Sequence, residues 1–227
     1  MVYQAGEMVM DNILGHQADL SNDYIERISR TKNIAVDCEM GGLNPHRDLL
    51  YLVQVADENN NVVLVKTRYW DEAKNLKSVL VNKEITKIFH FALMDCAFLD
   101  RYMSISIENV FCTKIASKLA RTYSNSHSLG SLLEELLGLE KEKKMQTSYW
   151  GGDITQEQMQ YAANDVKYLM RIKDRLESIL AEKGSLSSGL TYLELNSQCQ
   201  QFIPTLTQLW LNGWDFGVED PKSVFGH

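Results

Sequence analysis

The sequence predicts a mixed α/β fold in which helices flank a sheet of five strands. Three short, largely apolar runs that are typical of strands lie in the first third of the chain and are separated by brief polar turns. Strands joined by such short turns form an antiparallel meander. The period then changes toward that of helices, with two further short strands placed between helical segments, which is typical of parallel strands. A mixed sheet is therefore expected.

The five predicted strands all lie between residues 33 and 112. Gly41–Pro45 and Asp57–Asn61 carry the turn residues of the meander. The strands are expected at Asn33–Met40, Leu49–Ala56, Val62–Lys66, Lys87–Phe91 and Val110–Cys112.

The predicted helices occupy most of the second half of the chain. A helix is expected from Ala92 to Tyr102, a leucine-rich one near Ser128–Leu137 with Gly138 at its C-terminal cap, and a long one at Thr155–Leu180. The first thirty residues are expected to contain a short helix or a lead-in strand. We expect residues 1–184 to form the main domain and residues 185–227 a helical tail.

The composition is that of a single folded domain. With 227 residues, of which 44% are hydrophobic, the chain has enough apolar surface for one core. Its four cysteines form no CxxC pair and are interpreted as reduced thiols. No basic segment followed by an apolar run marks a signal peptide, and no stretch approaches the ~20 apolar residues of a membrane span. A cytoplasmic protein without membrane contact is expected.

The formal net charge of −7 argues against binding a long duplex through a broad basic face. It does not exclude nucleic acid altogether. A carboxylate cluster becomes an anion-binding site once it holds divalent cations.

Asp37 and Glu39 are the first candidate metal ligands. They lie two residues apart on the first predicted strand, so their side chains share one face. An Asp-x-Glu triplet occurs by chance roughly once in a chain of this size, and a solvated strand face is the simpler interpretation. The apolar residues around this strand favour the metal site, because a charge on a central strand must be paired or bind a cation.

Asp95 lies at the start of a helix that directly follows a predicted strand. This segment alone fits equally well with a carboxylate stabilised by the helix dipole. Tyr161 and Asp165 lie at i and i+4 on the long helix, hence on one face, where an ordinary hydrogen-bonded pair is the simpler interpretation.

Taken together, these five residues point to phosphodiester hydrolysis. Carboxylates are the hard oxygen ligands that hold a pair of Mg²⁺ or Mn²⁺ ions, and such a pair promotes attack of water on a phosphodiester. A tyrosine hydroxyl can orient that water or help to remove its proton.

The same residues resemble the motifs of a known family, the exonucleases with Asp-Glu-Asp-Asp carboxylates and a tyrosine in the third motif. The match with the ribonuclease D branch continues through the Val53–Asp57 strand and the Gln158–Val166 helix. The short nanoRNase C group is the most similar, in phrases such as Gly42–Asp48, Lys87–His90, Cys112–Tyr123 and Gly213–Asp215.

The resemblance implies an RNase H-like exonuclease fold and two divalent ions, Mg²⁺ or Mn²⁺. It implies that Asp37, Glu39, Asp95 and Asp165 hold the metals and that Tyr161 assists catalysis. It also implies release of 5′ mononucleotides from the 3′ ends of short single-stranded RNA, with dinucleotides as the shortest substrates and DNA as an alternative. A homo-oligomeric ring, for example an octamer, is implied as well. One departure stands out: Tyr149 occupies a position that is usually acidic in ribonuclease D relatives.

Five further residues are candidates for substrate contact. Met40 and Leu43 follow the first motif and are expected to wedge against the terminal bases, with ordinary packing beside a turn as the alternative. His90 lies near Asp95, and Arg121 and His127 lie in a polar loop of the kind that meets phosphates, although a solvated loop would have the same composition.

Two rival functions remain from the sequence. The chain could be a nucleic-acid-binding protein of this fold without catalysis, or a proofreading-type exonuclease that acts on DNA. The presence of all five catalytic positions argues against the first.

Overall fold

The computed structural model describes residues 13–140 and 148–212. Its centre is a six-stranded mixed sheet with the strand order β1-β4-β3-β2-β5-β6. The five predicted strands are confirmed within two residues of their expected ends. They are β2 (Asn33–Met40), β3 (Leu50–Ala56), β4 (Val62–Val65), β5 (Thr86–Phe89) and β6 (Val110–Cys112).

The predicted meander is also confirmed. β2, β3 and β4 pair antiparallel in sequence order, and β5 and β6 add to β2 in parallel. The sixth strand, β1 (Ile13–Gln17), pairs in parallel with β4 at the edge of the sheet. Its register shifts between Ile13 and His16, and Gly15 interrupts its apolar pattern, so its pairing depends on β4 more than on a local strand signal.

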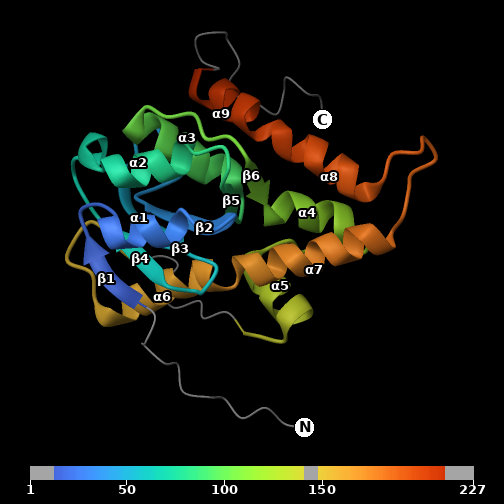
Figure 1. Ribbon diagram of the computed structural model, residues 1–227, viewed down its shortest axis with the longest axis horizontal. Helices are drawn as coiled ribbons and strands as arrows, with labels where there is room; N and C mark the ends of the chain where they lie inside the picture. The colour runs from blue at the N-terminus through green and yellow to red at the C-terminus, as the bar shows by residue number, and fades with distance from the viewer. Residues whose placement is uncertain (1–12, 141–147, 213–227) are drawn as a thin grey trace.

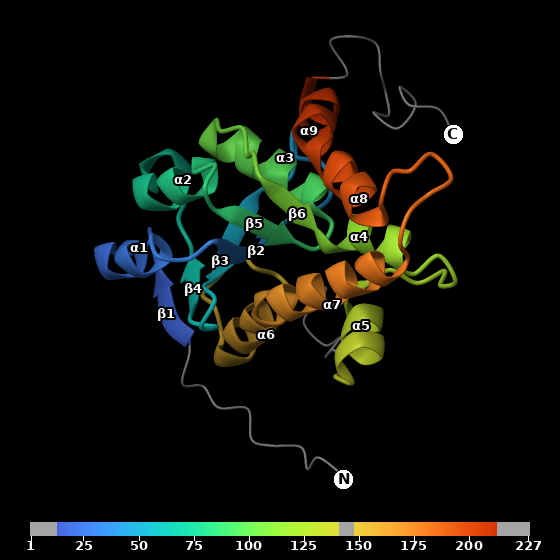
Figure 2. The same cartoon turned by 45° about the vertical axis from the view of Figure 1, so that its right-hand side comes forward.

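Helices cover both faces of the sheet, as Figures 1 and 2 show. One apolar core lies between the sheet and the first three helices, and a second lies between the other face and a group of four. The first group is α1 (Asn22–Ile28), α2 (Lys74–Val81) and α3 (Ala92–Met103), and the second is α4 (Thr113–Ala120), α5 (Leu129–Leu132), α6 (Gln156–Lys167) and α7 (Leu169–Glu182).

The predicted long helix from Thr155 to Leu180 is in fact two helices. The backbone leaves regular helical geometry at Tyr168, with φ −106° and ψ −3°, and α7 starts at the next residue. Val166, Leu169 and Ile172 are buried in the same core on both sides of the break. The apolar stripe therefore continues through it, which is why the period did not reveal it.

The leucine-rich segment near Ser128–Leu137 forms α5 and then a turn of π-helix, η3 (Leu133–Leu137). It ends as predicted at Gly138, whose φ of 67° is the left-handed conformation that favours glycine.

The tail folds back on the body as α8 (Tyr192–Gln201) and α9 (Ile203–Asn212). β6 is an edge strand, and the side-chain amide of Gln200 takes the place of a neighbouring strand: it accepts from the Cys112 N–H at 2.8 Å and donates to the Cys112 carbonyl at 3.2 Å. α9 runs along α3 (Figures 1 and 2). Residues 141–147 and 213–227, which include Gly213–Asp215, lie outside the described residues.

Across the two described ranges, every helix is too short or too polar to cross a bilayer.

Candidate active site

The central strand β2 presents its two carboxylates to the face covered by α6. Ile34, Val36 and Cys38 are buried in the core beneath α1, α2 and α3. Because side chains alternate along a strand, Asp37 and Glu39 point the other way. The two-residue spacing of these carboxylates therefore places both side chains on the same face of the sheet, as predicted.

α6 brings the third carboxylate to this face. The helix begins with a capping box in which Thr155 and Gln158 each bond the other's backbone N–H. Tyr161 and Asp165 follow one turn apart and are both buried. Ligand oxygens of Asp37, Glu39 and Asp165 all lie within 4.8 Å of one another.

Asp95 approaches from α3, the helix layer on the other side of the sheet. It is 3% exposed, and burial, followed by the charge of Asp37, raises its pKa well above the usual range. The backbone N–H and thiol of Cys38 donate to it. Asp95 thus adds a fourth carboxylate beside the cluster, held by the residue between Asp37 and Glu39.

The Tyr161 hydroxyl bonds Asp165, and burial, then the charges of Asp165, Glu39 and Asp37, raise the pKa of this phenol. Its ring lies 6.3 Å from that of the buried Trp150, centroid to centroid. Tyr161 therefore keeps its proton in the chain alone and acts as a hydroxyl, while the charge of a bound cation would act in the opposite direction.

A cavity of about 420 Å³ opens over the cluster. Its lining includes the three carboxylates that do not come from α6, namely Asp37, Glu39 and Asp95. The loop that follows β2 also lines it. Asp165, although a member of the cluster, and its neighbour Tyr161 are buried on α6 and are not part of the lining. The other lining residues are Cys38, Met40, Gly41, Gly42, Leu43, His90, Phe91, Met94, Ser148 and Trp150.

The donor set fits a hard divalent cation. Mg²⁺ and Mn²⁺ prefer carboxylate oxygens, and several converge here. The buried side-chain oxygen of Gln54 has no hydrogen-bond partner among the described residues, whereas its amide nitrogen donates to Glu39 at 3.3 Å. Such an oxygen suits a site that takes up a hydrated cation, because water bound to the ion can donate to it.

Three of the five predicted substrate-contact residues line this cavity. Met40 and Leu43 lie on the loop after β2, and the Leu43 side chain is 73% exposed. The Thr113 hydroxyl donates to the Phe89 carbonyl, so His90, whose Nδ1 lies 2.9 Å from the Thr113 oxygen, donates to it through Nδ1. This bond fixes the orientation of the His90 ring at the cavity wall.

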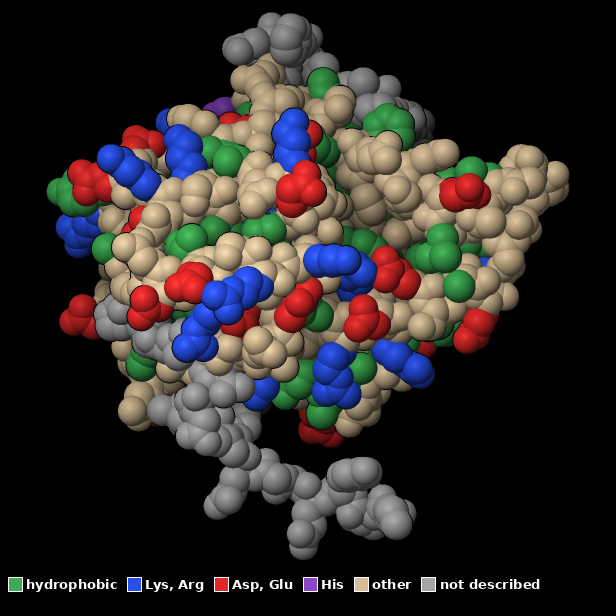
Figure 3. Space-filling model, in the orientation of Figure 1, with side chains coloured by type: hydrophobic (Ala, Val, Ile, Leu, Met, Phe, Trp, Pro, Cys, Tyr) green, Lys and Arg blue, Asp and Glu red, His purple; other side chains and the backbone are tan. Residues whose placement is uncertain are grey.

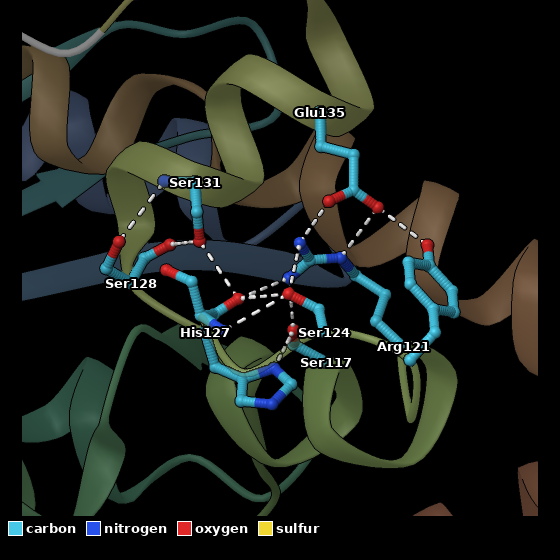
Figure 4. A network of polar contacts seen from close by, with 9 residues as sticks. Ser117, Arg121, Ser124, His127, Ser128, Ser131 and Glu135 are labelled. Atoms are coloured by element: carbon cyan, nitrogen blue, oxygen red, sulfur yellow. Dashed lines mark hydrogen bonds and ion pairs between the residues drawn. The ribbon is translucent and has the colours of Figure 1, made fainter.

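Arg121 and His127 are not brought to the cavity. Arg121 is 1% exposed, and its guanidinium donates to Glu135 through both Nε and Nη2 and to the Ser126 carbonyl (Figure 4). His127 Nδ1 lies 2.9 Å from the Ser117 hydroxyl in the same network. The arginine holds the pKa of Glu135 at about 2. Both residues thus have structural partners that join α4 to the α5–η3 segment.

Sequence reasoning assigned no role to Gln54, Cys38, Met94 or Ser148. Gln54 lies opposite Asp37 in the β2–β3 register and is fully buried. Its position as a polar residue within the otherwise apolar strand β3 could have marked it in the sequence as a candidate site residue. Met94 and Ser148 carried none, because only the folded chain brings their segments to the cavity.

The fold and the carboxylate cluster define a class of nucleic-acid hydrolases, and comparison with known proteins gives the family. Residues 15–181 match the family model described as 3′-5′ exonuclease. The chain therefore belongs to the 3′-5′ exonuclease family, and its enzymes act on nucleic acids.

Solved structures support the membership over nearly the whole chain. Brucella melitensis NrnC is 36% identical with a TM-score of 0.84, covering 96% of this chain and 99% of that one. A structure of NrnC bound to pGG is 37% identical with a TM-score of 0.81 and covers 90% and 95% of the two chains. A third NrnC structure contains bound Mg²⁺.

Curated relatives match over shorter parts of their own length. The exosome complex exonuclease RRP6 of Saccharomyces cerevisiae is 28% identical over 179 residues, which is 78% of this chain and 24% of that protein. DNA polymerase I of Aquifex aeolicus is 29% identical over 213 residues, 86% of this chain and 34% of the relative. The chain thus spans about a quarter to a third of these relatives.

Proposed function

We propose that this protein is a metal-dependent exonuclease that removes 5′ mononucleotides from the 3′ ends of short RNA oligonucleotides, down to dinucleotides. The observation that carries the proposal is the convergence of Asp37, Glu39 and Asp165 within 4.8 Å beneath an open cavity, with Asp95 beside Asp37.

The four carboxylates are the proposed ligands of two divalent ions, Mg²⁺ or Mn²⁺. Bound there, the ions would supply Lewis-acid chemistry: a lower pKa for the attacking water and stabilisation of the leaving 3′ oxygen. Gln54 holds Glu39 through its amide, and Cys38 holds Asp95 through its backbone and thiol. These bonds keep two of the four carboxylates oriented before any ligand arrives.

Tyr161 is the proposed catalytic hydroxyl. Its bond to Asp165 places the phenol at the edge of the carboxylate cluster, where it can orient a water molecule. Leu43 and Met40 are proposed to contact the terminal base, because both line the cavity and Leu43 is largely exposed. His90, which also lines the cavity, is proposed to contact the sugar or phosphate.

The charge on the protein surface favours short substrates over long duplexes. Basic and acidic side chains are interspersed on the face shown in Figure 3, and the whole chain carries a net charge of −7. Neither feature supports counterion release along a long duplex. The pGG bound to NrnC in a similar structure is a dinucleotide, which supports the same substrate class for this chain. Proofreading-type cleavage of DNA is the second candidate, because DNA polymerase I is among the relatives.

The domain bounds, the oligomeric state and the cellular compartment are also proposals. Residues 1–184 form the exonuclease domain, and residues 185–227 form a tail that contributes to a homo-oligomeric ring, for example an octamer. The cytoplasm is the proposed compartment. Cys38, Cys96 and Cys112 are buried free thiols, and a reducing compartment keeps thiols in the free form.

The test is a hydrolysis assay on 5′-labelled RNA and DNA oligonucleotides of two to seven residues. We expect stepwise loss of 3′ nucleotides with Mg²⁺ or Mn²⁺ and none with EDTA, with RNA dinucleotides cleaved efficiently. Binding without cleavage under all metal conditions would establish the non-catalytic rival. Faster cleavage of DNA than of matched RNA would favour the proofreading alternative.

A further inference from the structure

The loop between β2 and β3, residues 41–49, carries Leu43 to the active-site cavity. Gly41, Gly42 and Leu43 all line this cavity. The Gly41 N–H donates to the Leu49 carbonyl at 2.8 Å and closes the base of the loop. The Leu43 side chain is 73% exposed, so little packing holds it. Its place at the cavity therefore depends on the backbone of the loop.

The carboxylate of Asp48 bonds the loop backbone next to Leu43. It accepts from the Asn44 N–H at 2.9 Å, and the Leu43 N–H donates to it as well. The Arg47 guanidinium donates to both of its oxygens, at 2.7 and 3.0 Å. The arginine, followed by the Asn44 N–H, lowers the pKa of Asp48 to about 2. Charge-assisted bonds thus hold the peptide groups on both sides of the Leu43 side chain.

Gly42 leaves the space that this carboxylate occupies. A Cβ atom at Gly42 would lie 2.1 Å from Asp48 Oδ2, far closer than van der Waals contact allows. A side chain at residue 42 would therefore displace either the carboxylate or the loop. The close approach of these two residues is a second sign that the loop is built around Asp48.

The backbone at Asp48 is attached to α3, the helix that carries Asp95. The Tyr102 hydroxyl donates to the Asp48 carbonyl at 2.9 Å. The Tyr102 ring is parallel to that of the buried Phe98, with centroids 6.3 Å apart and an interplanar angle of 2°. Asp48 thus holds the loop at Leu43 through its side chain and joins it to α3 through its carbonyl. Leu43 is thereby placed relative to the carboxylate cluster in the chain alone.

We propose that Asp48 is a positioning residue for substrate binding, because its carboxylate holds Leu43 over the cavity to contact the terminal base. The inference rests on the proposed function, in which Leu43 makes that contact. A contact that is present both before and during the reaction contributes to affinity rather than to the chemical step. Loss of the Asp48 carboxylate should therefore weaken substrate binding and leave turnover nearly unchanged.

The test is a double-mutant cycle on the full chain with Leu43→Ala, Asp48→Ala and the double variant. Affinity for a 5′-phosphorylated RNA dinucleotide is measured by calorimetry with Ca²⁺ in place of Mg²⁺, and kcat is measured with Mg²⁺. We expect each single substitution to weaken binding about tenfold, near the lower end of the range for losing a contact with one base. The kcat should change less than about threefold.

The double variant carries the decision. Because Asp48 acts through Leu43, we expect the double variant to bind no more weakly than Leu43→Ala. Asp48→Asn keeps an oxygen that can accept from the two backbone N–H groups, so it should retain most of the affinity. Losses that multiply in the double variant would overturn the proposal, and so would wild-type affinity in either single alanine variant.

Gly42→Ala tests the same contact from the other side. Its methyl group would displace the Asp48 carboxylate, so we expect it to weaken binding like Asp48→Ala and to add no further loss in the Asp48→Ala background. If Asp48→Ala does not fold, Gly42→Ala takes its place in the cycle with Leu43→Ala. His46→Ala is the matched control and should bind as the wild type does, because His46 is exposed in the same loop but does not line the active-site cavity.

The two measurements separate this inference from the proposed function, because calorimetry requires no hydrolysis. Coupling between Asp48 and Leu43 in a protein that binds the dinucleotide but does not hydrolyse it would uphold the positioning role and contradict the exonuclease. Hydrolysis by the wild type, together with independent losses in the two single variants, would do the reverse.

Discussion

Removing the Tyr161 hydroxyl should separate catalysis from metal binding. Tyr161→Phe keeps the ring that packs near Trp150 and deletes the group that bonds Asp165. We expect kcat on a labelled dinucleotide to fall by about 10²–10⁴-fold, the range for loss of a positioned proton-transfer group. Mn²⁺ affinity, measured by calorimetry, should change less than about threefold. A variant that keeps its kcat would show that the hydroxyl has no part in the reaction.

The residues of the cluster differ in how far their positions follow from local sequence. Asp37 and Glu39 share a face because of the period of β2, and Tyr161 and Asp165 share one because of the period of α6. Each of these two shared faces was therefore predictable from residue spacing. Asp95 comes from the opposite helix layer, and only the fold brings it beside Asp37. Its place in the site could be expected from the family resemblance but not from any spacing.

Lys87 gives a prediction about stability and pH. It is fully buried on β5, donates to the Asn82 carbonyl at 2.7 Å, and burial lowers its pKa to about 8. Between pH 8 and ~10.4 the unfolded chain holds a proton that the folded chain has released, so this group raises the free energy of unfolding as pH increases.

The measurement is urea unfolding of the wild type and Lys87→Met at pH 7.5 and 9.5. Relative to the variant, the wild type should gain on the order of 1–2 kcal/mol over this interval. The exposed Lys74→Met is the control and should follow the wild type at both values. Parallel pH curves for the wild type and Lys87→Met would contradict the lowered pKa.

At the scale of the elements, the strands and their order were predicted more closely than the helices. The bounds of β2 to β4 were predicted almost to the residue, because each is a short, largely apolar run that ends at turn residues. The break at Tyr168 and the π-helical turn at η3 had no such signal, since apolar residues continue through both. The sequence of β1 fits a helix or a strand, because its pairing with β4 forms only in the folded chain.

The Arg121–Glu135 pair should stabilise the contact between α4 and η3. Arg121 is almost fully buried, whereas the Glu135 side chain is 39% exposed, so removing the carboxylate leaves a buried guanidinium with fewer partners. We expect Glu135→Ala to lower the free energy of unfolding by roughly 1–3 kcal/mol, less than for a fully buried pair.

Glu134→Ala is the matched control for that change. Glu134 is the preceding residue, and it is exposed. In urea unfolding this variant should lie within about 0.5 kcal/mol of the wild type. Equal effects of the two substitutions would mean that loss of helix surface charge, rather than the pair with Arg121, explains the result.

At the scale of the whole molecule, charge limits the mode of nucleic-acid binding. With a net charge of −7, and with charges of both signs interspersed on the face shown in Figure 3, we expect electrostatic attraction to come only from substrate phosphates near the site. For one or two phosphate contacts, dinucleotide affinity should fall about three- to sevenfold between 50 and 200 mM salt. Calorimetry at several salt concentrations measures this slope. A loss of 10³-fold or more would contradict this expectation and indicate binding through a broad basic surface.

The tail adds a feature that its sequence did not reveal. α8 was expected to be helical, but nothing indicated that Gln200 would bond both backbone groups of Cys112 on the edge strand β6. This contact depends on the approach of two segments 88 residues apart. The boundary after residue 184 and the role of the tail in assembly stay predictions.

We claim that the carboxylate cluster is the catalytic metal site, and Asp165→Asn removes one of its proposed metal ligands. The measured quantity is Mg²⁺-dependent release of mononucleotide from a labelled RNA dinucleotide, with Asp174→Asn, an exposed aspartate on α7, as control. We predict that Asp165→Asn loses more than about 100-fold in turnover, exceeding the 10–100-fold typical of residues that only support a ligand, while Asp174→Asn retains wild-type turnover. Turnover of Asp165→Asn within tenfold of the wild type would contradict the claim.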